Sequence, residues 1–354
     1  MSNNISEIVI WAHSECRSTM SLYREVKRQA GVPVTIALWQ YGDNAEMRAK
    51  RETTGQSKGE YDDLVSVPVG EDLVRGEKLL AMHCGKGAVQ VFCVYQNSPV
   101  WRQLILLAKK LGLYVAVYAE APCEMCLGFK AWLKRLYYRF VLPLKLREVV
   151  QSADLFISQS GRIGMDRLTR LGWSQEKIVP FGYASAVSSG LAARDYVEID
   201  KRPLRVLHTG VETPYRSVET LLSAERVLKR RGIRIEIVRT HGALPVYEME
   251  RLYKWADVSV ACGLCEPWGM RVVDAIHAGL PVIVSDGMGV EWMVDKFGCG
   301  SVYKKGNARE LADILERFAK DADFRSLLTA GVSAAHEAWR PENRAKDFLE
   351  VLTR

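Results

Sequence analysis

Two acids frame the predicted start of a helix in the stretch of this chain best suited to chemistry. Glu266 precedes the helix, and Asp274 follows eight residues later on the helix itself. An acid just before a helix can accept hydrogen bonds from hydroxyl groups. The free N–H groups of Gly269, Met270 and Arg271 would face an anion, which the helix dipole favours. One site would then bind a polyol, a diphosphate and a second diol, which are the parts of a nucleotide sugar.

The elements around this stretch must hold the two acids in place. Pro267, Trp268 and Gly269 lead into the helix, and residues 278–286 read as a glycine stop followed by a buried strand. An ordinary strand–helix–strand unit has the same outline, and acids at helix starts are common caps. That purely structural interpretation is the alternative to a ligand site.

The composition predicts a soluble globular protein of two domains. The chain has 354 residues, of which 48% are hydrophobic and 26% charged, and this length suits two domains. No apolar run in the sequence is long enough to span a bilayer. The first residues are polar and acidic, unlike a secretory signal, so we expect a cytoplasmic location. The net charge of +7 favours anionic partners. Zinc-finger spacing and RNA-binding aromatic motifs are missing, so nucleotide-sugar diphosphates or an anionic lipid surface are expected rather than nucleic acid.

Apolar strands alternate with amphipathic helices, which predicts an α/β fold with two doubly wound, Rossmann-like domains facing a cleft. We expect an N-terminal domain over 1–185, a linker over 186–203, a second domain over 204–338 and a final helix over 339–354. The expected strands are 7–12, 34–38, 64–67, 89–94, 114–118, 155–158, 205–209, 234–238, 258–261, 281–285 and 300–303. The expected helices are 20–30, 100–111, 161–171, 218–231, 247–254, 268–278, 308–320, 323–338 and 341–352.

The stretch around Glu266 resembles the E-x7-E signature of retaining GT-B glycosyltransferases of family four, with Asp274 as the second acid. The resemblance continues through residues 253–258 and 278–294 and is weak before Ser152. It implies a GT-B fold whose C-terminal helix crosses back to the N-terminal domain. It also implies metal-independent transfer of a sugar from a nucleoside diphosphate sugar to a glycan or lipid-linked acceptor, as in bacterial surface polysaccharide or lipopolysaccharide synthesis, without a further cofactor.

The resemblance assigns roles to individual residues. Glu266 would contact the donor sugar, Asp274 the ribose, and Arg216 the diphosphate, in the place of a family lysine. Glu120 ends a strand of the first domain and would orient the acceptor or stabilise charge on the sugar ring. The remaining predicted donor-binding residues are Gly210, His241, Gly242, Pro267, Trp268, Gly269, Met270 and Arg271.

The sequence also departs from the family pattern. Val211 stands where the family has an arginine, so Arg271 or Arg239 would have to supply the lost charge. Arg239 also replaces the first glycine of a turn that Gly242 completes. The usual Gly-Gly turn after the first strand is replaced by residues 13–19, where Ser18 and Thr19 are weak candidates for lining the site. These departures leave open a non-catalytic sugar-nucleotide-binding partner protein, or a nucleotide-sugar epimerase or phosphorylase of the same fold.

Metal binding is not expected from the sequence. Two C-x-x-C pairs, Cys123 with Cys126 and Cys262 with Cys265, are far apart in the chain and have no histidine at finger spacing. No D-x-D suits a metal diphosphate, because Asp321 and Asp323 fall between late helices and read as caps or surface acids. Four further histidines show no ligand spacing and are expected to be structural: His83, His208, His277 and His336.

A basic amphipathic helix is expected over 127–142. Its large apolar residues recur at helical spacing: Phe129, Trp132, Leu133, Leu136 and Phe140. Its basic residues occupy other faces or follow Pro143: Lys130, Lys134, Arg135, Arg139, Lys145 and Arg147. This pattern suits an anionic membrane surface, which predicts a peripheral protein on the inner face of the membrane. A helix packed on the core with a basic outer face is the alternative.

Overall fold

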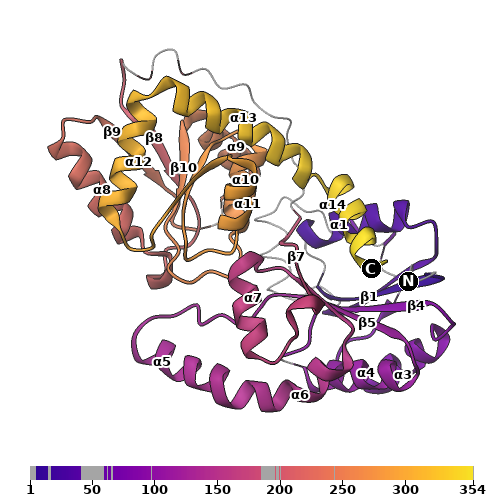
Figure 1. Ribbon diagram of the computed structural model, residues 1–354. Helices are drawn as coiled ribbons and strands as arrows, with labels where there is room; N and C mark the ends of the chain where they lie inside the picture. The colour runs from indigo at the N-terminus through magenta and orange to yellow at the C-terminus, as the bar shows by residue number, and fades with distance from the viewer. Residues whose placement is uncertain are drawn as a thin grey trace. The chain divides into compact units, whose positions relative to one another are not determined.

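The computed structural model describes residues 5–14, 17–40, 60, 61, 63, 64, 67–96, 98–184, 196, 199, 201–242 and 244–353. The chain divides into two compact α/β units (Figure 1). The first comprises Met1–Pro122, Leu133–Ala186 and Pro341–Arg354, and the second comprises Cys123–Trp132 and Val187–Arg340. Most of the linker expected over 186–203 lies outside the described residues.

The first unit is built on a parallel sheet with the strand order β3-β2-β1-β4-β5-β6-β7 among the described residues. Its strands are β1 Glu7–Ser14, β2 Val34–Gln40, β3 Val67–Pro68, β4 Ala88–Phe92, β5 Tyr114–Ala119, β6 Leu155–Ser158 and β7 Ile178–Pro180. The strand expected over 64–67 is confirmed only at Val67, because Leu64 lies in a turn and β3 consists of Val67 and Pro68. Residues 65 and 66 lie outside the described residues. Pro68 has no N–H to extend the pairing with β2. Strand β7 was not predicted, since its three residues show no pattern.

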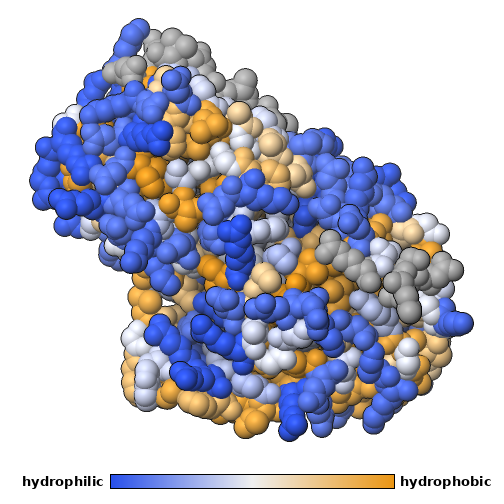
Figure 2. Space-filling model, in the orientation of Figure 1, coloured by the Kyte–Doolittle hydropathy of each residue, from blue (hydrophilic) through white to orange (hydrophobic). Residues whose placement is uncertain are grey.

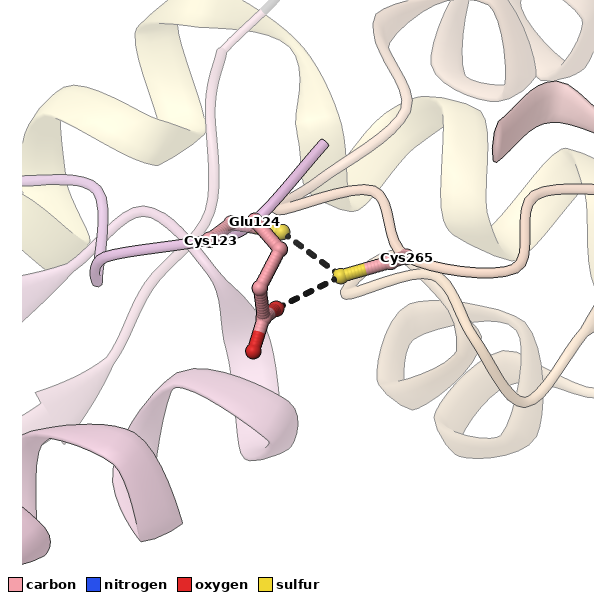
Figure 3. A group of neighbouring side chains, drawn as sticks. All are labelled: Cys123, Glu124 and Cys265. Atoms are coloured by element: carbon pink, nitrogen blue, oxygen red, sulfur yellow. Dashed lines mark hydrogen bonds between the residues drawn. The ribbon is translucent and has the colours of Figure 1, made fainter. Parts of the chain in front are cut away.

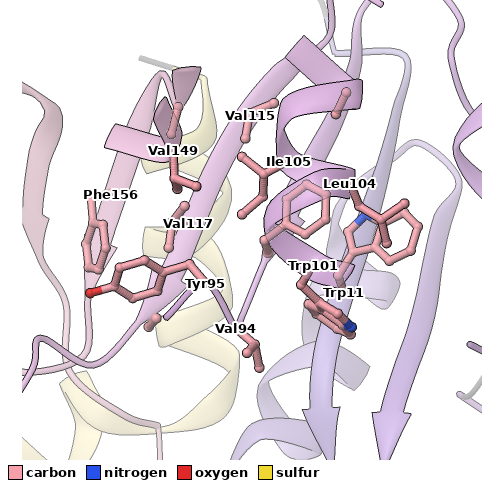
Figure 4. Close-up of a cluster of buried hydrophobic side chains, with 14 of the residues drawn as sticks. Trp11, Val94, Tyr95, Trp101, Leu104, Ile105, Val115, Val117, Val149 and Phe156 are labelled. Carbon is pink, nitrogen blue, oxygen red and sulfur yellow. The ribbon is translucent and has the colours of Figure 1, made fainter. Parts of the chain in front are cut away.

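Helices cover both faces of this sheet (Figure 1). They are α1 Arg17–Gln29, α3 Leu73–Met82, α4 Pro99–Lys110, α6 Leu142–Ser152, α7 Gly161–Arg170 and α14 Pro341–Leu352, with the short 3-10 helix Gln175–Lys177. Helix α5 Gly128–Leu136 is divided between the two units after Trp132, and Ala131 is its one buried residue. Helices α3, α4 and α6 pack on one face over an aromatic cluster that includes Trp11, Trp101 and Phe156 (Figure 4). Trp11 stacks on Phe92 with ring centroids 5.2 Å apart. Helix α3 lies between two of the expected strands, where no bounds were given for a helix.

Helix α14 belongs to the first unit although it follows the whole second unit in sequence. It packs beside α1, and its Ala345 and Phe348 are buried in the core of the other sheet face. The guanidinium of Arg344 lies 3.6 Å from the Phe181 ring centroid and donates to the Phe181 carbonyl at 2.9 Å. Burial lowers the pKa of Arg344 to about 10. This placement agrees with the expected return of the last helix to the N-terminal domain.

The second unit has a parallel sheet with the order β12-β11-β10-β8-β9 among the described residues. Its strands are β8 Leu204–His208, β9 Ile235–Arg239, β10 Val258–Ala261, β11 Val282–Ser285 and β12 Gly300–Tyr303. Its helices are α8 Val218–Arg230, α9 Val246–Trp255, α10 Met270–His277, α11 Glu291–Phe297, α12 Ala308–Lys320 and α13 Ala322–Trp339, with the 3-10 helix Pro214–Arg216. The order reverses between β8 and β10, and ligands bind at such a switch point in open α/β sheets. Asp321 caps α13 by accepting from the Phe324 N–H, as predicted.

The helix expected over 127–142 is interrupted. Helix α5 passes into a π-helical turn, Tyr137–Val141, and then into α6. Pro143 lacks an N–H and its ring conflicts with the carbonyl four residues earlier, which explains a widened turn at this point. No helix in the described residues is long and apolar enough to span a membrane.

Candidate functional site

The loops that follow β8, β9 and β10 are bound to one another at the switch point. The Gly210 N–H donates to Thr240 Oγ1, just after β9, at 2.8 Å. The Leu264 N–H, in the loop after β10, donates to the Tyr215 carbonyl at 2.7 Å. These hydrogen bonds fix the backbone from which Arg216 and Glu266 project.

Glu266 lies between two guanidinium groups. Its Oε2 is 3.0 Å from Arg271 Nη2, and its Oε1 is 3.7 Å from Arg216 Nη2. The Glu266 and Arg271 side chains are each 10% exposed, so the group is largely withdrawn from water. Two cations therefore face one anion, which leaves a net positive charge where electrostatic interactions are strong.

The backbone of Glu266 is held as firmly as its side chain. Its N–H donates to the Gly287 carbonyl at 2.9 Å, and its carbonyl accepts from the Gly289 N–H at 3.1 Å. Helix α10 begins at Met270 rather than at 268 as expected, because Gly269 has φ +123°, which a helix cannot include. Trp268 is buried and stacks on Trp339 with centroids 6.0 Å apart. Buried Pro267 and Trp268 thus anchor the loop that presents Glu266.

Gly210 makes room for the two arginines. Its φ is +105°, and a Cβ at this position would lie 3.1 Å from Arg216 Nη1 and 3.6 Å from Arg271 Nη1. Arg271 Nη1 also donates to the Thr209 carbonyl at 2.9 Å. The Nε atoms of Arg216 and Arg271 are buried without a hydrogen-bond partner. Buried donors without a partner are costly, and both arginines bring guanidinium Nη1 atoms close to Gly210.

A third arginine, Arg239, ends β9 beside His208 of β8 and pairs with Glu212. Arg239 Nη1 lies 2.9 Å from Glu212 Oε1. His208 is fully buried, and its Nδ1–H donates to the Val260 carbonyl at 2.9 Å. Burial, followed by the charge of Arg271, lowers the pKa of His208 to about 4, and Arg216 and Arg239 act in the same direction. His208 is therefore neutral near pH 7, and three guanidinium groups act on one strand end.

Four further predicted donor-binding residues belong to the second unit: Asp274, His241, Gly242 and Met270. Asp274 lies half-buried on α10, and its charge adds to burial in raising the pKa of Tyr253 on α9. His241 is exposed, with Nδ1 3.4 Å from Glu212 Oε1, and Gly242 is half-buried. Met270 begins α10 and is half-buried.

The candidate residues Glu120, Ser18 and Thr19 belong to the first unit. Glu120 follows β5, and its carbonyl accepts from Gln96 Nε2 at 3.1 Å. Thr19 lies in α1, and the side chain of Ser18 is outside the described residues. Within the second unit, the structure brings together Gly210, Arg216, Glu266 and Arg271.

Two residues of this site were not predicted. Thr240 fixes Gly210, and Glu212 pairs with Arg239. Both lie in loops directly after strands that adjoin the switch point. That position is the signal that would have identified them, since neither residue type stands out in the sequence.

One family comparison covers most of the second unit. Residues 202–330 match the family described as glycosyl transferases group 1. The match covers a little over a third of the chain and includes the whole site of the second unit. The chain matches no curated protein. The match supports a glycosyltransferase.

Solved structures establish the fold across the whole chain. The Anabaena protein HepE, in complex with UDP and glucose, shares 13% identity at a TM-score of 0.62 over 98% of this chain and 99% of that one. The lipopolysaccharide outer core galactosyltransferase WaaB, in its apo form, shares 12% identity at a TM-score of 0.63. That match covers 98% of this chain and 99% of WaaB. TarM shares 10% sequence identity with this chain at a TM-score of 0.61, and the match covers 100% of both chains. The chain therefore has the GT-B fold, with two Rossmann-like domains as predicted.

Proposed function

We propose that this protein is a retaining glycosyltransferase that moves a sugar from a nucleoside diphosphate sugar to a glycan or lipid-linked acceptor in bacterial surface polysaccharide synthesis. The observation that carries the proposal is the pair of buried, unpartnered Nε–H groups on Arg216 and Arg271 beside Gly210. They lie at a switch point within the segment that matches the group 1 family. The neighbours HepE and TarM, which bind UDP, add support.

Sugar transfer from a nucleoside diphosphate sugar requires little covalent catalysis by the protein. The diphosphate gains negative charge as it leaves, and fixed cations in a largely dry site stabilise that charge. Arg216 and Arg271 would do this, with Arg271 replacing the charge missing at Val211. We propose that transfer consequently needs no divalent metal at the diphosphate. Glu266, held by Arg271, would accept hydrogen bonds from the donor sugar, Asp274 would bind the ribose, and Glu120 would act on the acceptor side.

Acceptor-dependent turnover with a fixed stereochemical outcome tests this function. Nucleoside diphosphate release should rise at least tenfold when extracted bacterial membrane lipids are added, and remain with chelator present. The new glycosidic linkage should keep the anomeric configuration of the donor, as measured by NMR. Interconversion of the donor sugar without acceptor would instead identify an epimerase. Donor binding without any turnover would identify the non-catalytic alternative.

A lipid-linked acceptor gives a reason for the surface of α5 and the π-helical turn. Ala131 is the one residue of α5 that is buried, while Phe129 and Trp132 are 70% and 51% exposed. The apolar surface continues through Leu133, Tyr137, Phe140, Val141 and Leu144, all exposed. Figure 2 shows this hydrophobic surface along the lower edge of the molecule, where Figure 1 places α5 and α6. The alternative of a core-packed helix does not describe α5.

Basic residues flank the same surface. Six lysines and arginines and no acidic residue occur over 127–147, and all six are exposed. Arg139 lies over the Phe140 ring and Lys145 over the Tyr137 ring, at 5.5 and 5.8 Å from the centroids. Aromatic side chains beside basic ones suit the interface of an anionic bilayer. We propose that this surface, residues 127–147, binds an anionic membrane.

Vesicle sedimentation tests the membrane proposal. The protein should bind vesicles containing phosphatidylglycerol and not vesicles of phosphatidylcholine alone. Changing Lys130, Lys134, Arg135 and Arg139 to glutamine should weaken binding at least 100-fold, because each basic residue contributes about 1 kcal/mol at such a surface. The control Leu327→Ser removes an exposed leucine from α13 and should bind as before. Equal binding by the quadruple variant would contradict the proposal.

A further inference from the structure

Two cysteines that are far apart in sequence meet beside the candidate site. The sulfur atoms of Cys123 and Cys265 are 3.1 Å apart, and the Cys265 thiol donates to Glu124 Oε2 at 3.0 Å (Figure 3). The segment of Cys123 and the loop of Cys265 both belong to the second unit. Among the residues that the structure describes, these three form the one group of at least three His, Cys, Asp or Glu ligand atoms within 4.8 Å of one another.

The spacing of these atoms is close to that of a tetrahedral metal site. Metal–sulfur and metal–oxygen distances of about 2.3 and 2.0 Å place two sulfurs about 3.8 Å apart and a sulfur and an oxygen about 3.5 Å apart. The observed separations of 3.1 and 3.0 Å would have to open by roughly half an ångström. Closing the two sulfurs to a disulfide would need a larger movement, to about 2.0 Å.

Each C-x-x-C pair contributes only one of its two cysteines to this three-residue group. The motif spacing in the sequence therefore did not reveal the group. Cys262 is fully buried, and burial raises its pKa to about 11. It lies at the end of β10, whereas Cys265 is half-buried in the loop beyond. Cys123 and Glu124 directly precede Met125, whose φ of +47° is a conformation that non-glycine residues rarely adopt. One cysteine of each pair therefore joins the group, together with an acid that the motif does not include.

We propose that Cys123, Glu124 and Cys265 bind a thiophilic divalent cation, Zn²⁺ among those commonly available, with a water molecule as the fourth ligand. Binding would displace the two thiol protons, so affinity would fall as the pH is lowered. The cation would fasten residues 123–132 to the loop that leads into Glu266. This site is separate from the diphosphate chemistry of Arg216 and Arg271, and it goes beyond the proposed function.

Metal titration of the reduced full-length protein tests the proposal. One equivalent of Zn²⁺ should be taken up in competition with a chromophoric chelator, and Co²⁺ should give a near-ultraviolet thiolate charge-transfer band. Cys123→Ser and Cys265→Ser should each lose affinity by more than the roughly 10- to 100-fold that loss of an outer-shell partner costs. Glu124→Gln should weaken binding less, because one ligand of lower affinity for soft metals is removed.

A matched control separates this group from general thiol binding. Cys84 is an exposed cysteine of the first unit, and Cys84→Ser should bind the metal as the unchanged protein does. Circular dichroism establishes that each variant is folded, and Zn²⁺ should raise the melting temperature of the unchanged protein but not of Cys265→Ser. The proposal is overturned if the folded protein takes up no Zn²⁺, or if Cys265→Ser binds it equally well. It is also overturned if metal uptake is lacking and a disulfide reagent instead links Cys123 to Cys265.

Discussion

Replacement of Arg271 by glutamine should weaken binding of a nucleoside diphosphate sugar by roughly 10- to 100-fold, and kcat should fall further. A hydrogen bond from a charged group contributes about 1.5–3 kcal/mol, and removal of one preorganised donor to developing charge costs about 10²–10³ in rate. Arg271 also holds Glu266 through its 3.0 Å ion pair. The variant therefore loses a phosphate contact and releases the carboxylate that would face the sugar.

Two controls distinguish this effect from misfolding. Arg317→Gln removes an exposed arginine of α12 that pairs with Asp321, and it should leave binding and turnover unchanged. Arg271→Lys keeps the charge without the planar fork and should recover only part of the activity. A folded Arg271→Gln protein with unchanged affinity and kcat would show that Arg271 is not a donor-site residue.

Lowering the pH from 7 to 4 should remove on the order of 5 kcal/mol from the free energy of unfolding of the second unit. The Nδ1 atoms of His277 on α10 and His336 on α13 are 3.1 Å apart. Burial, followed by His336 and Arg340, lowers the pKa of His277 from 6.5 to about 3. Burial similarly lowers the pKa of His208 to about 4.

The sign of this effect follows from proton uptake. Below pH 6.5 the unfolded chain protonates these histidines while the folded protein does not, so stability is lost as the pH falls from 6.5 towards these lower pKa values. His277→Gln should therefore flatten the pH dependence, as measured by urea unfolding. An equal loss of stability in the unchanged protein and in His277→Gln would contradict this account.

The sequence predicted the architecture because its signals are local. Apolar runs such as 258–261 and the periodicity of 308–320 match β10 and α12 residue for residue. Short or marginal elements such as β7 were missed, since three residues carry no periodicity. The start of α10 was misplaced because Gly269 has φ +123°, which the sequence pattern does not reveal. An added Cβ at Gly269 would also lie 2.6 Å from the Met288 side chain.

The residue types of the candidate site could be predicted from the sequence, but the contacts between its side chains could not. Glu266 and Arg216 followed from a motif, whereas the choice of Arg271 over Arg239 as the second arginine beside Gly210 requires coordinates. The meeting of Cys123 and Cys265 depends on how two loops pack, which sequence spacing does not encode. Exposure of Phe129 and Trp132 likewise reflects which face of α5 the fold covers, and helical spacing is the same for either face.

Calorimetric titration of UDP, GDP and ADP and of their sugars into the protein, beside Arg216→Gln and Arg271→Gln, tests the central claim most directly. The account predicts that one nucleoside diphosphate and its sugar bind with one site per chain, and that each substitution weakens binding at least tenfold. The same ligand at about 100 times its dissociation constant should stabilise the unchanged protein by about 2.7 kcal/mol. Absence of binding by every ligand, or equal binding by the folded Arg271→Gln protein, would contradict a diphosphate site at the end of β8.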